Sequence, residues 1–144
     1  MRVVGKSLST SIDLTLSGLN REEKIIQFSE LNPTYCIEND TIRDVINKII
    51  EKGHRRLPIL TKDKKLVGIV TTMDILSAFL RKQNFLEKIS VIMNREVIFC
   101  DVNETLNNVI TKFKFSRRGG FPVTKNGKLV GMISERDIVR RFSS

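Results

Sequence analysis

The chain has 144 residues, of which 40% are hydrophobic and 28% are charged, and its formal net charge is +9. This composition predicts a compact globular protein that folds without disulfides or a structural metal. No apolar run approaches the roughly 18 residues that cross a bilayer, and the start MRVVGKSLSTSIDLTL lacks the apolar block of a signal peptide. We therefore expect a cytoplasmic protein without a membrane partner.

The positive charge lies in the later parts of the chain. Residues 1–30 are neutral overall, residues 31–93 carry +4 and residues 94–144 carry +5. Such an excess is compatible with nucleic-acid binding, with another anionic ligand, or with solubility alone. No block of five or six like charges occurs, and Tyr35 is the only Tyr in a chain without Trp. Both facts weaken an interpretation based on base stacking.

Residues 1–30 form an N-terminal extension. The stretch SLSTSIDLTLSG alternates like a β-strand but has no evident partner strand. The next stretch, REEKIIQFSEL, is predicted to be a short helix that leads into the following unit. The extension either docks on the rest of the chain, pairs with a neighbouring subunit, or stays mobile.

Residues 31–85 contain a complete set of elements. The extended piece PTYCI precedes the helix start signal NDTIRD, after which apolar residues recur at helical spacing. Two apolar runs, LPIL and KLVGIV, are joined by the polar TKDKK, which predicts a β-hairpin. A second amphipathic helix follows, with apolar residues at Ile75, Leu76, Phe79 and Leu80. The predicted order is β-α-β-β-α.

Residues 90–144 repeat this set. KKLVGIVTTMD returns as GKLVGMISERD, Cys36 aligns with Cys100 at an offset of 64, and Gly68 aligns with Gly131 at an offset of 63. The offset changes by one residue just before the hairpin turn, where a duplicated unit tolerates such a change most easily. The chain is therefore a tandem duplication.

The duplication predicts an α+β fold in which two β-α-β-β-α units pack sheet to sheet with pseudo-twofold symmetry. One unit of about fifty residues would leave one face of its three-stranded sheet exposed and would be marginal alone. Pairing solves this problem and creates two equivalent clefts where strand ends of the two halves meet. Clefts at such junctions are common ligand sites.

The repeated motif resembles that of the CBS domain, and the tandem pair resembles a Bateman module. Its residues are Gly68-Ile69-Val70-Thr71-Thr72-Met73-Asp74 and Gly131-Met132-Ile133-Ser134-Glu135-Arg136-Asp137. RRLPIL, GGFPV and VNETL are also similar to the family pattern. The resemblance covers roughly residues 31–144 and is specific because two copies share matching flanks.

The motif also has a chemical interpretation of its own. A carboxylate on the first turn of a helix can accept both hydroxyls of a ribose, and a hydroxyl side chain three residues earlier lies close enough to share the sugar. This assigns ribose binding to Thr71, Asp74, Ser134 and Asp137. The helix N-terminus also favours a phosphate. The alternative is that Asp74 and Asp137 only cap their helices.

The resemblance narrows the ligand and adds further residues. It implies an adenosine compound such as AMP, ADP, ATP or S-adenosylmethionine, with no catalytic cofactor. It also implies that Arg55 and Arg56 contact phosphate, and that Tyr35, Ile37, Val97 and Ile98 lie on strands at the adenine side. Arg136, just before Asp137, is a further phosphate candidate that would partly compensate at the second site. A solvated basic edge is the alternative for Arg55 and Arg56.

The two sites differ in sequence at the position before the shared proline. The first unit has Arg55-Arg56, whereas the second has Gly119-Gly120 with its arginines, Arg117 and Arg118, two residues upstream. The site of Asp74 is therefore predicted to favour a second phosphate more than the site of Asp137, unless the displaced arginines reach back.

Other candidate residues do not indicate catalysis. His54, the only histidine, has no nucleophile or acidic partner at a telling spacing, so we expect a surface or hydrogen-bonding role. Cys36 and Cys100 are interpreted as reduced, buried core residues. No triad order, metal cluster or P-loop is evident in the sequence.

Three hypotheses for function follow. The leading one is a non-enzymatic sensor, a homodimer held together by the second helices, whose adenosine ligand changes what a separate protein partner contacts. The second is a basic nucleic-acid-binding protein, and the third is an interaction module whose clefts bind no ligand.

Overall fold

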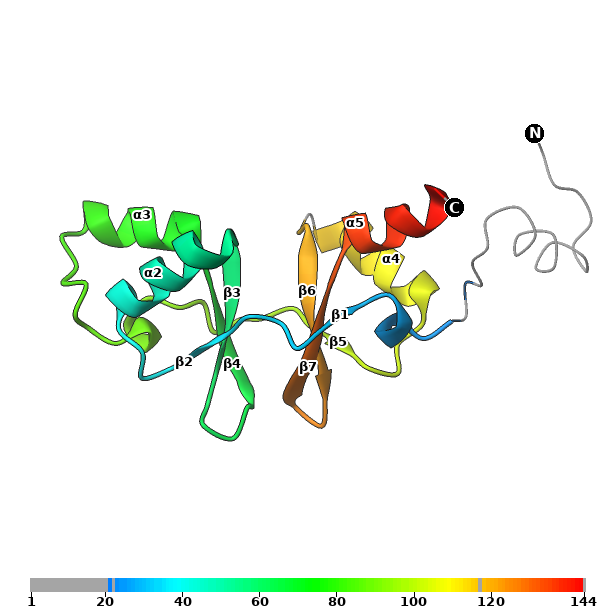
Figure 1. Ribbon diagram of the computed structural model, residues 1–144, viewed down its shortest axis with the longest axis horizontal. Helices are drawn as coiled ribbons and strands as arrows, with labels where there is room; N and C mark the ends of the chain where they lie inside the picture. The colour runs from blue at the N-terminus through cyan, green and yellow to red at the C-terminus, as the bar shows by residue number, and fades with distance from the viewer. Residues whose placement is uncertain (1–20, 22, 117, 144) are drawn as a thin grey trace, which may run out of the picture. The chain divides into compact units, whose positions relative to one another are not determined.

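The computed structural model describes residues 21, 23–116 and 118–143. Within that part the chain forms two sheets and four α-helices, so the predicted α+β class is confirmed (Figure 1). It divides into two compact units: one comprises residues 32–98 and 124–129, and the other comprises residues 99–123 and 130–143 with the described residues before 32. The alternating stretch SLSTSIDLTLSG lies outside the described residues.

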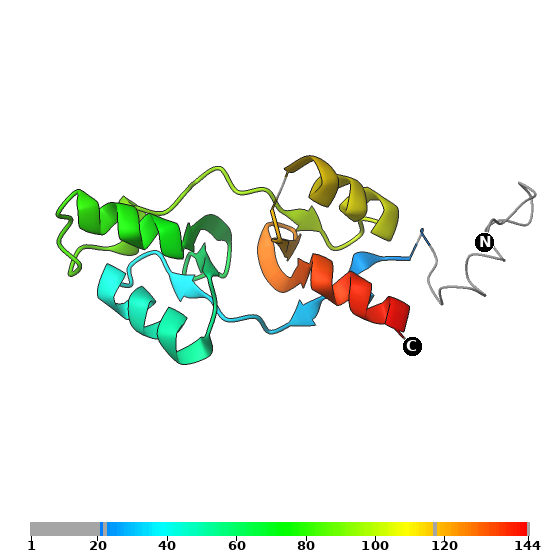
Figure 2. The same cartoon turned by 90° about the horizontal axis from the view of Figure 1, so that it is seen from above.

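The first repeat has the predicted order. Its elements are β2 (Cys36–Ile37), α2 (Ile42–Lys52), β3 (Arg56–Leu60), β4 (Leu66–Thr71) and α3 (Thr72–Leu80), followed by the 3₁₀ turn η2 (Ile89–Val91). The strand order is β2-β3-β4, with β2 parallel and β4 antiparallel to β3. Figures 1 and 2 show α2 and α3 side by side.

Local sequence explains where α2 begins and ends. Thr41 Oγ1 accepts a hydrogen bond from Asp44 N at 3.0 Å, and Asp44 Oδ2 accepts one from Thr41 N at 3.0 Å, which is a capping box. At the other end Gly53 has φ +72° and donates its N–H to Ile49 O. Glycine adopts this left-handed conformation without steric cost, so it ends the helix cleanly.

The second repeat has the same order with one added strand. Its elements are β5 (Cys100–Asp101), α4 (Leu106–Ser116), β6 (Gly120–Lys125), β7 (Lys128–Ser134), α5 (Glu135–Arg140) and η3 (Arg141–Ser143), and it gains β1 (Glu30–Leu31). The strand order is β1-β7-β6-β5. Asn126 and Gly127 both have positive φ and close the β6–β7 hairpin, as their sequence predicts.

The segment REEKIIQFSEL differs from the predicted helix. Its described residues contain the 3₁₀ turn η1 (Ile25–Gln27), which β1 follows, and no α-helix. Ile25, fully buried, and Phe28 belong to the core built around Phe113, Phe121 and the rest of the second repeat. The lead-in to the first repeat therefore completes the core and the sheet that contain β5, β6 and β7.

The motif glycines permit a close approach by another stretch of backbone. A Cβ on Gly131 would lie 2.8 Å from the carbonyl oxygen of Glu30 in the paired strand β1. A Cβ on Gly68 would lie 2.5 Å from Met93 Sδ, beside Asn94, which exchanges two hydrogen bonds with Ile69. Each glycine thus leaves room for a segment that crosses the edge of its sheet.

These contacts predict unequal costs for adding a methyl group. Gly131→Ala meets rigid backbone, so we expect it to lower the free energy of unfolding by about 1–3 kcal/mol. Gly68→Ala meets chiefly a thioether that can change rotamer, so its cost should be smaller. Urea unfolding of both variants measures the difference, and a larger loss for Gly68→Ala would contradict this account.

Candidate functional site

The first candidate site lies where β4 runs directly into α3. Thr71 is both the last residue of the strand and the N-cap of the helix, and Asp74 occupies the third helical position. Asp74 N donates to Thr71 Oγ1 at 3.2 Å, and Thr71 N donates to Asp74 Oδ2 at 2.8 Å. The box holds the hydroxyl and the carboxylate together at the start of the helix.

The second candidate site repeats this geometry where β7 meets α5. Asp137 N donates to Ser134 Oγ at 3.1 Å, and Ser134 N donates to Asp137 Oδ2 at 2.8 Å. Asp137 Oδ1 also lies 3.8 Å from a guanidinium nitrogen of Arg140. The repeat places Ser77 at the position of Arg140, so the first site has no such pair. The sequence analysis did not include Arg140, although its position three residues after Asp137 on a predicted helix indicates that the two side chains can pair.

Capping and ligand binding are compatible at Asp74. The capping residues are Thr71 and Ser134, and the two aspartates instead complete the boxes. The box occupies Asp74 Oδ2, while Asp74 Oδ1 makes no hydrogen bond or ion pair with the described residues. A carboxylate offers about four acceptor positions, so a half-buried Asp74 retains acceptors for a ligand. The ribose assignment remains a prediction.

The predicted phosphate contacts differ between the two sites. Arg56 begins β3 and is the register partner of Thr71, and Arg55 O accepts a hydrogen bond from Thr72 N at 2.9 Å. The structure thus brings both arginines to the first strand–helix junction. The equivalent residue of the second repeat is Gly120, which has no side chain. It lies beside the second junction, because a Cβ placed on it would be 3.8 Å from Ser134 Cβ.

Arginines near the second junction do not duplicate Arg56. Arg136 is exposed beside Asp137. Arg118 has a buried Nε without a hydrogen-bond partner among the described residues, and Arg117 lies outside them. The predicted difference between the sites therefore has a structural counterpart at Gly120, while its effect on ligands stays a prediction.

The adenine-side residues fall into two groups. Tyr35 is half-buried, and Ile37 lies in β2, where it pairs with Leu60 at the end of β3 away from Arg56. Val97 and Ile98 precede β5 and, like Tyr35, belong to no strand, so the prediction that these three residues lie in strands is wrong. Their position beside an adenine stays a prediction.

In the alignment of the two repeats, Phe99 is the residue equivalent to Tyr35, and the sequence analysis did not include Phe99 among the candidates. The offset of 64 that relates the two cysteines was sufficient to identify Phe99.

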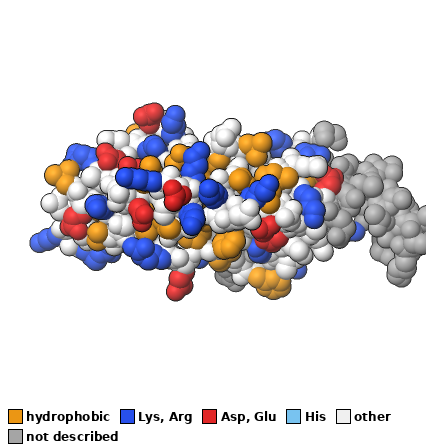
Figure 3. Space-filling view, turned by 90° about the horizontal axis from the view of Figure 1, so that it is seen from below, with side chains coloured by type: hydrophobic (Ala, Val, Ile, Leu, Met, Phe, Trp, Pro, Cys, Tyr) orange, Lys and Arg blue, Asp and Glu red, His pale blue; other side chains and the backbone are white. Residues whose placement is uncertain are grey.

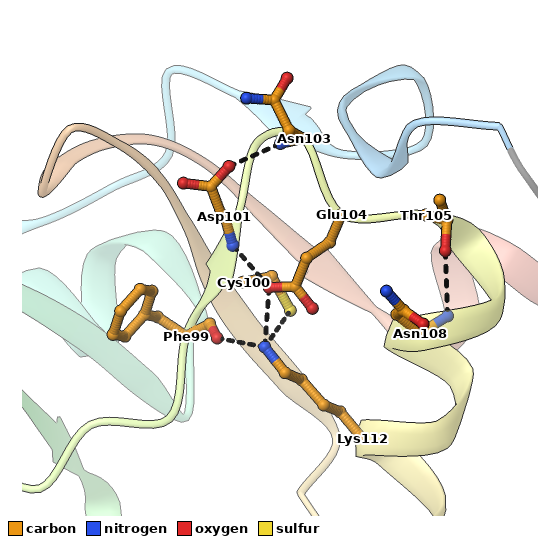
Figure 4. Close-up of polar contacts among 8 residues, drawn as sticks. All are labelled: Phe99, Cys100, Asp101, Asn103, Glu104, Thr105, Asn108 and Lys112. Atoms are coloured by element: carbon orange, nitrogen blue, oxygen red, sulfur yellow. Dashed lines mark hydrogen bonds and ion pairs between the residues drawn. The ribbon is translucent and has the colours of Figure 1, made fainter.

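A lysine holds in place the extended segment before β2 and the one before β5. Lys48 Nζ donates to Tyr35 O at 2.8 Å, and Lys112 Nζ donates to Phe99 O at 2.7 Å. Lys112 also pairs with Glu104 at 2.8 Å and lies 3.9 Å from Cys100 Sγ (Figure 4). The charged amine therefore anchors the segment beside a buried thiol.

The cysteines and the histidine have the structural roles expected of them. Cys36 and Cys100 are free and buried, and burial raises the pKa of each thiol to about 11 despite the nearby lysine. Such thiols stay protonated, and so weakly nucleophilic, at neutral pH. His54 Nε2 lies within hydrogen-bond distance of Thr34 Oγ1, at 3.3 Å, which agrees with the predicted hydrogen-bonding role.

One hollow of about 460 Å³ lies elsewhere in the first repeat. It is lined by Arg43, Phe79, Leu80, Lys82, Gln83 and Phe85 and contains none of the predicted site residues. Among the described residues, no group of three or more His, Cys, Asp or Glu could hold a metal ion. None of the helices described has the length and apolar character that a bilayer span requires.

The sequence profile of the CBS domain matches residues 28–81 and again residues 88–144. The chain belongs to the CBS domain family. The CBS domain pair of protein MJ0100, solved with 5′-methylthioadenosine and S-adenosyl-L-methionine, is 28% identical with a TM-score of 0.72, and the match covers 83% of this chain and 99% of that one. A putative acetoin utilization protein of Vibrio cholerae, 24% identical with a TM-score of 0.76 over 82% of this chain and 88% of that one, shares the fold.

Two curated relatives that the chain matches are longer proteins. An uncharacterized protein of Methanocaldococcus jannaschii, MJ1004, is 31% identical over 123 residues, which are 83% of this chain and 56% of the relative. A homoserine O-acetyltransferase of Methanococcus vannielii is 29% identical over 125 residues, which are 84% of this chain and 25% of the relative. The chain thus spans between a quarter and about half of these relatives.

Proposed function

We propose that this CBS pair is a non-catalytic sensor that binds an adenosine-containing ligand, namely AMP, ADP, ATP or S-adenosylmethionine. Asp74 and Asp137 hold the ribose, with Thr71 and Ser134 beside them. The ligand changes the arrangement of the module and thereby what a separate protein partner contacts, which requires different affinities for the two arrangements.

The observation that carries this proposal is the second oxygen of Asp74. It lies on the first turn of α3 and remains available after the capping box has used its neighbour. Both repeats place a hydroxyl and a carboxylate in this geometry, which suits the paired hydroxyls of a sugar. The bound 5′-methylthioadenosine and S-adenosyl-L-methionine of the MJ0100 domain pair support an adenosine ligand in particular.

Replacement of Asp74 tests the proposal, and Asp44 provides a matched control because it completes the same box at the start of α2. We expect each variant to lose about 1 kcal/mol of stability through its box. Only Asp74→Ala should lose one of the two ligand sites, with about ten- to a hundred-fold weaker binding there, because a charge-assisted hydrogen bond contributes roughly 1.5–3 kcal/mol. Calorimetry with S-adenosylmethionine and AMP measures both sites.

Two results would contradict the proposal. Unchanged titrations for both Asp74→Ala and Asp137→Ala, with the fold intact, would show that the aspartates serve only the helix starts. If the unaltered chain showed no heat of binding and no thermal shift with any adenosine compound, the chain would be an interaction module without a ligand.

We further propose that the Asp74 site prefers a second phosphate. Arg56 stands at the start of β3 beside Thr71, whereas Gly120 brings no side chain to the other junction and Arg140 competes for Asp137. ADP should therefore bind better than AMP by about tenfold, or 1.4 kcal/mol, at the Asp74 site and by less at the Asp137 site.

Variants that keep only one site measure the preference for ADP at each site separately. Asp137→Ala leaves the Asp74 site intact, and Asp74→Ala leaves the other, so calorimetry with AMP and ADP compares them directly. Adding Arg56→Gly to Asp137→Ala should reduce the advantage of ADP to that of the other site. An equal advantage at both sites would refute the asymmetry.

We also propose that two copies associate through the second helices of the repeats. Four large apolar side chains on α3 and two in α5 and η3 are more than half exposed: Met73, Leu76, Phe79, Leu80, Val139 and Phe142. Exposed apolar surface of this extent on a small protein is typical of an interface.

Sedimentation at about 20 µM, where an obligate interface should hold, tests this association. The unaltered chain should sediment as a dimer and Leu80→Glu as a monomer. Val91→Glu is the control because Val91 is 55% exposed but lies on η2. Sedimentation of the unaltered chain as a monomer would rule out this interface.

A further inference from the structure

Five lysines lie on the turns that close the two hairpins. Lys62, Lys64 and Lys65 belong to the β3–β4 turn and its edge, and Lys125 and Lys128 flank the β6–β7 turn. All five are exposed and belong to the compact unit of residues 32–98 and 124–129. We call this group the lysine tip. Asp63 is the only acidic residue in residues 61–65 and 125–128, so these two segments together carry +4 of the net charge of +9.

Backbone hydrogen bonds hold the two turns together. Leu66 N donates to Gly127 O at 3.0 Å, and Leu129 N donates to Lys64 O at 3.1 Å. Lys65 and Lys128 are direct partners in an antiparallel bridge. The cations are therefore brought together by the fold rather than by chance contact of flexible side chains.

This arrangement is electrostatically unfavourable in the absence of a ligand. Like charges that face each other across an antiparallel pair are destabilising. In the part of the chain that the structure describes, no lysine of the tip takes part in an ion pair. A bound polyanion would relieve this repulsion.

The chemistry of the turns favours one class of polyanion. Residues 61–65 and 125–128 contain no aromatic residue on which a single-stranded base could stack and no apolar side chain to insert into a membrane. Lysine binds phosphate as a point charge and needs no particular base. A nucleic-acid duplex presents one negative charge per roughly 1.7 Å along a rigid backbone.

We propose that the lysine tip binds the phosphate backbone of double-stranded nucleic acid without reading its sequence. Figure 3 views the molecule from below, the side toward which the hairpin turns point in Figure 1, and shows Lys and Arg side chains among acidic and apolar ones. This site is separate from the proposed ribose site, because Lys65 precedes β4 whereas Thr71 ends it. A strand of six residues spans about 20 Å. The two functions can therefore fail independently.

The test is the salt dependence of binding to a fluorescent 20-base-pair duplex, made both as DNA and as RNA, between 50 and 200 mM KCl. If five lysines each displace a counterion, the logarithm of the affinity should fall with the logarithm of salt with a slope of about −4.5. Binding should then weaken about 500-fold over this range. Duplexes of scrambled sequence should bind equally well.

Charge-matched variants locate the surface. The triple variant K62Q/K64Q/K65Q should reduce the slope to about −1.8. The control K82Q/K88Q/K114Q removes three exposed lysines elsewhere and should leave the slope unchanged. Asp74→Ala should bind the duplex normally. No binding of either duplex at 50 mM KCl, equal effects of the two triple variants, or tighter binding to phosphatidylserine vesicles than to either duplex would overturn the proposal.

Discussion

The direct passage from strand to helix is the constraint on which the candidate sites depend. Because Thr71 and Ser134 each end a strand and cap the following helix, no loop separates the sheet from the helix N-terminus. The capping box then fixes the aspartate three residues later relative to the strand end. The hydroxyl and the carboxylate are consequently positioned by backbone geometry rather than by flexible side chains.

The two strand–helix junctions share the same capping box but differ in the residues around it. The corresponding hydrogen bonds of the two boxes differ in length by about 0.1 Å at most, yet the residues around the boxes differ in charge. The first junction has Arg56 where the second has Gly120, and the second has Arg140 where the first has Ser77. The two junctions thus carry arginines at different positions around the same backbone arrangement.

Sequence periodicity was sufficient for the repeat, the order of elements and both junctions, because these depend on local signals such as Thr71 before Asp74 and Asn126-Gly127 at a turn. It failed where the outcome depends on distant partners. REEKIIQFSEL has a helical pattern, but Ile25 is buried against residues about eighty or more positions later, and Glu30 is drawn into a strand by β7. Val97 and Ile98 are β-formers that find no partner strand, and the lysine that anchors Phe99 lies thirteen residues away on α4.

The strand β1 has a consequence for how the chain acquires its structure during synthesis. Glu30 and Leu31 pair with Met132 and Gly131, about a hundred residues further on, so β1 has no partner strand until those residues have been made. At a translation rate of about 5–20 residues per second, that delay lasts roughly five to twenty seconds. The sheet of residues 32–98 has its three strands within one short stretch of chain and can form during that interval. The sheet that contains β1 therefore closes after the sheet of residues 32–98, although β1 precedes that sheet in the chain.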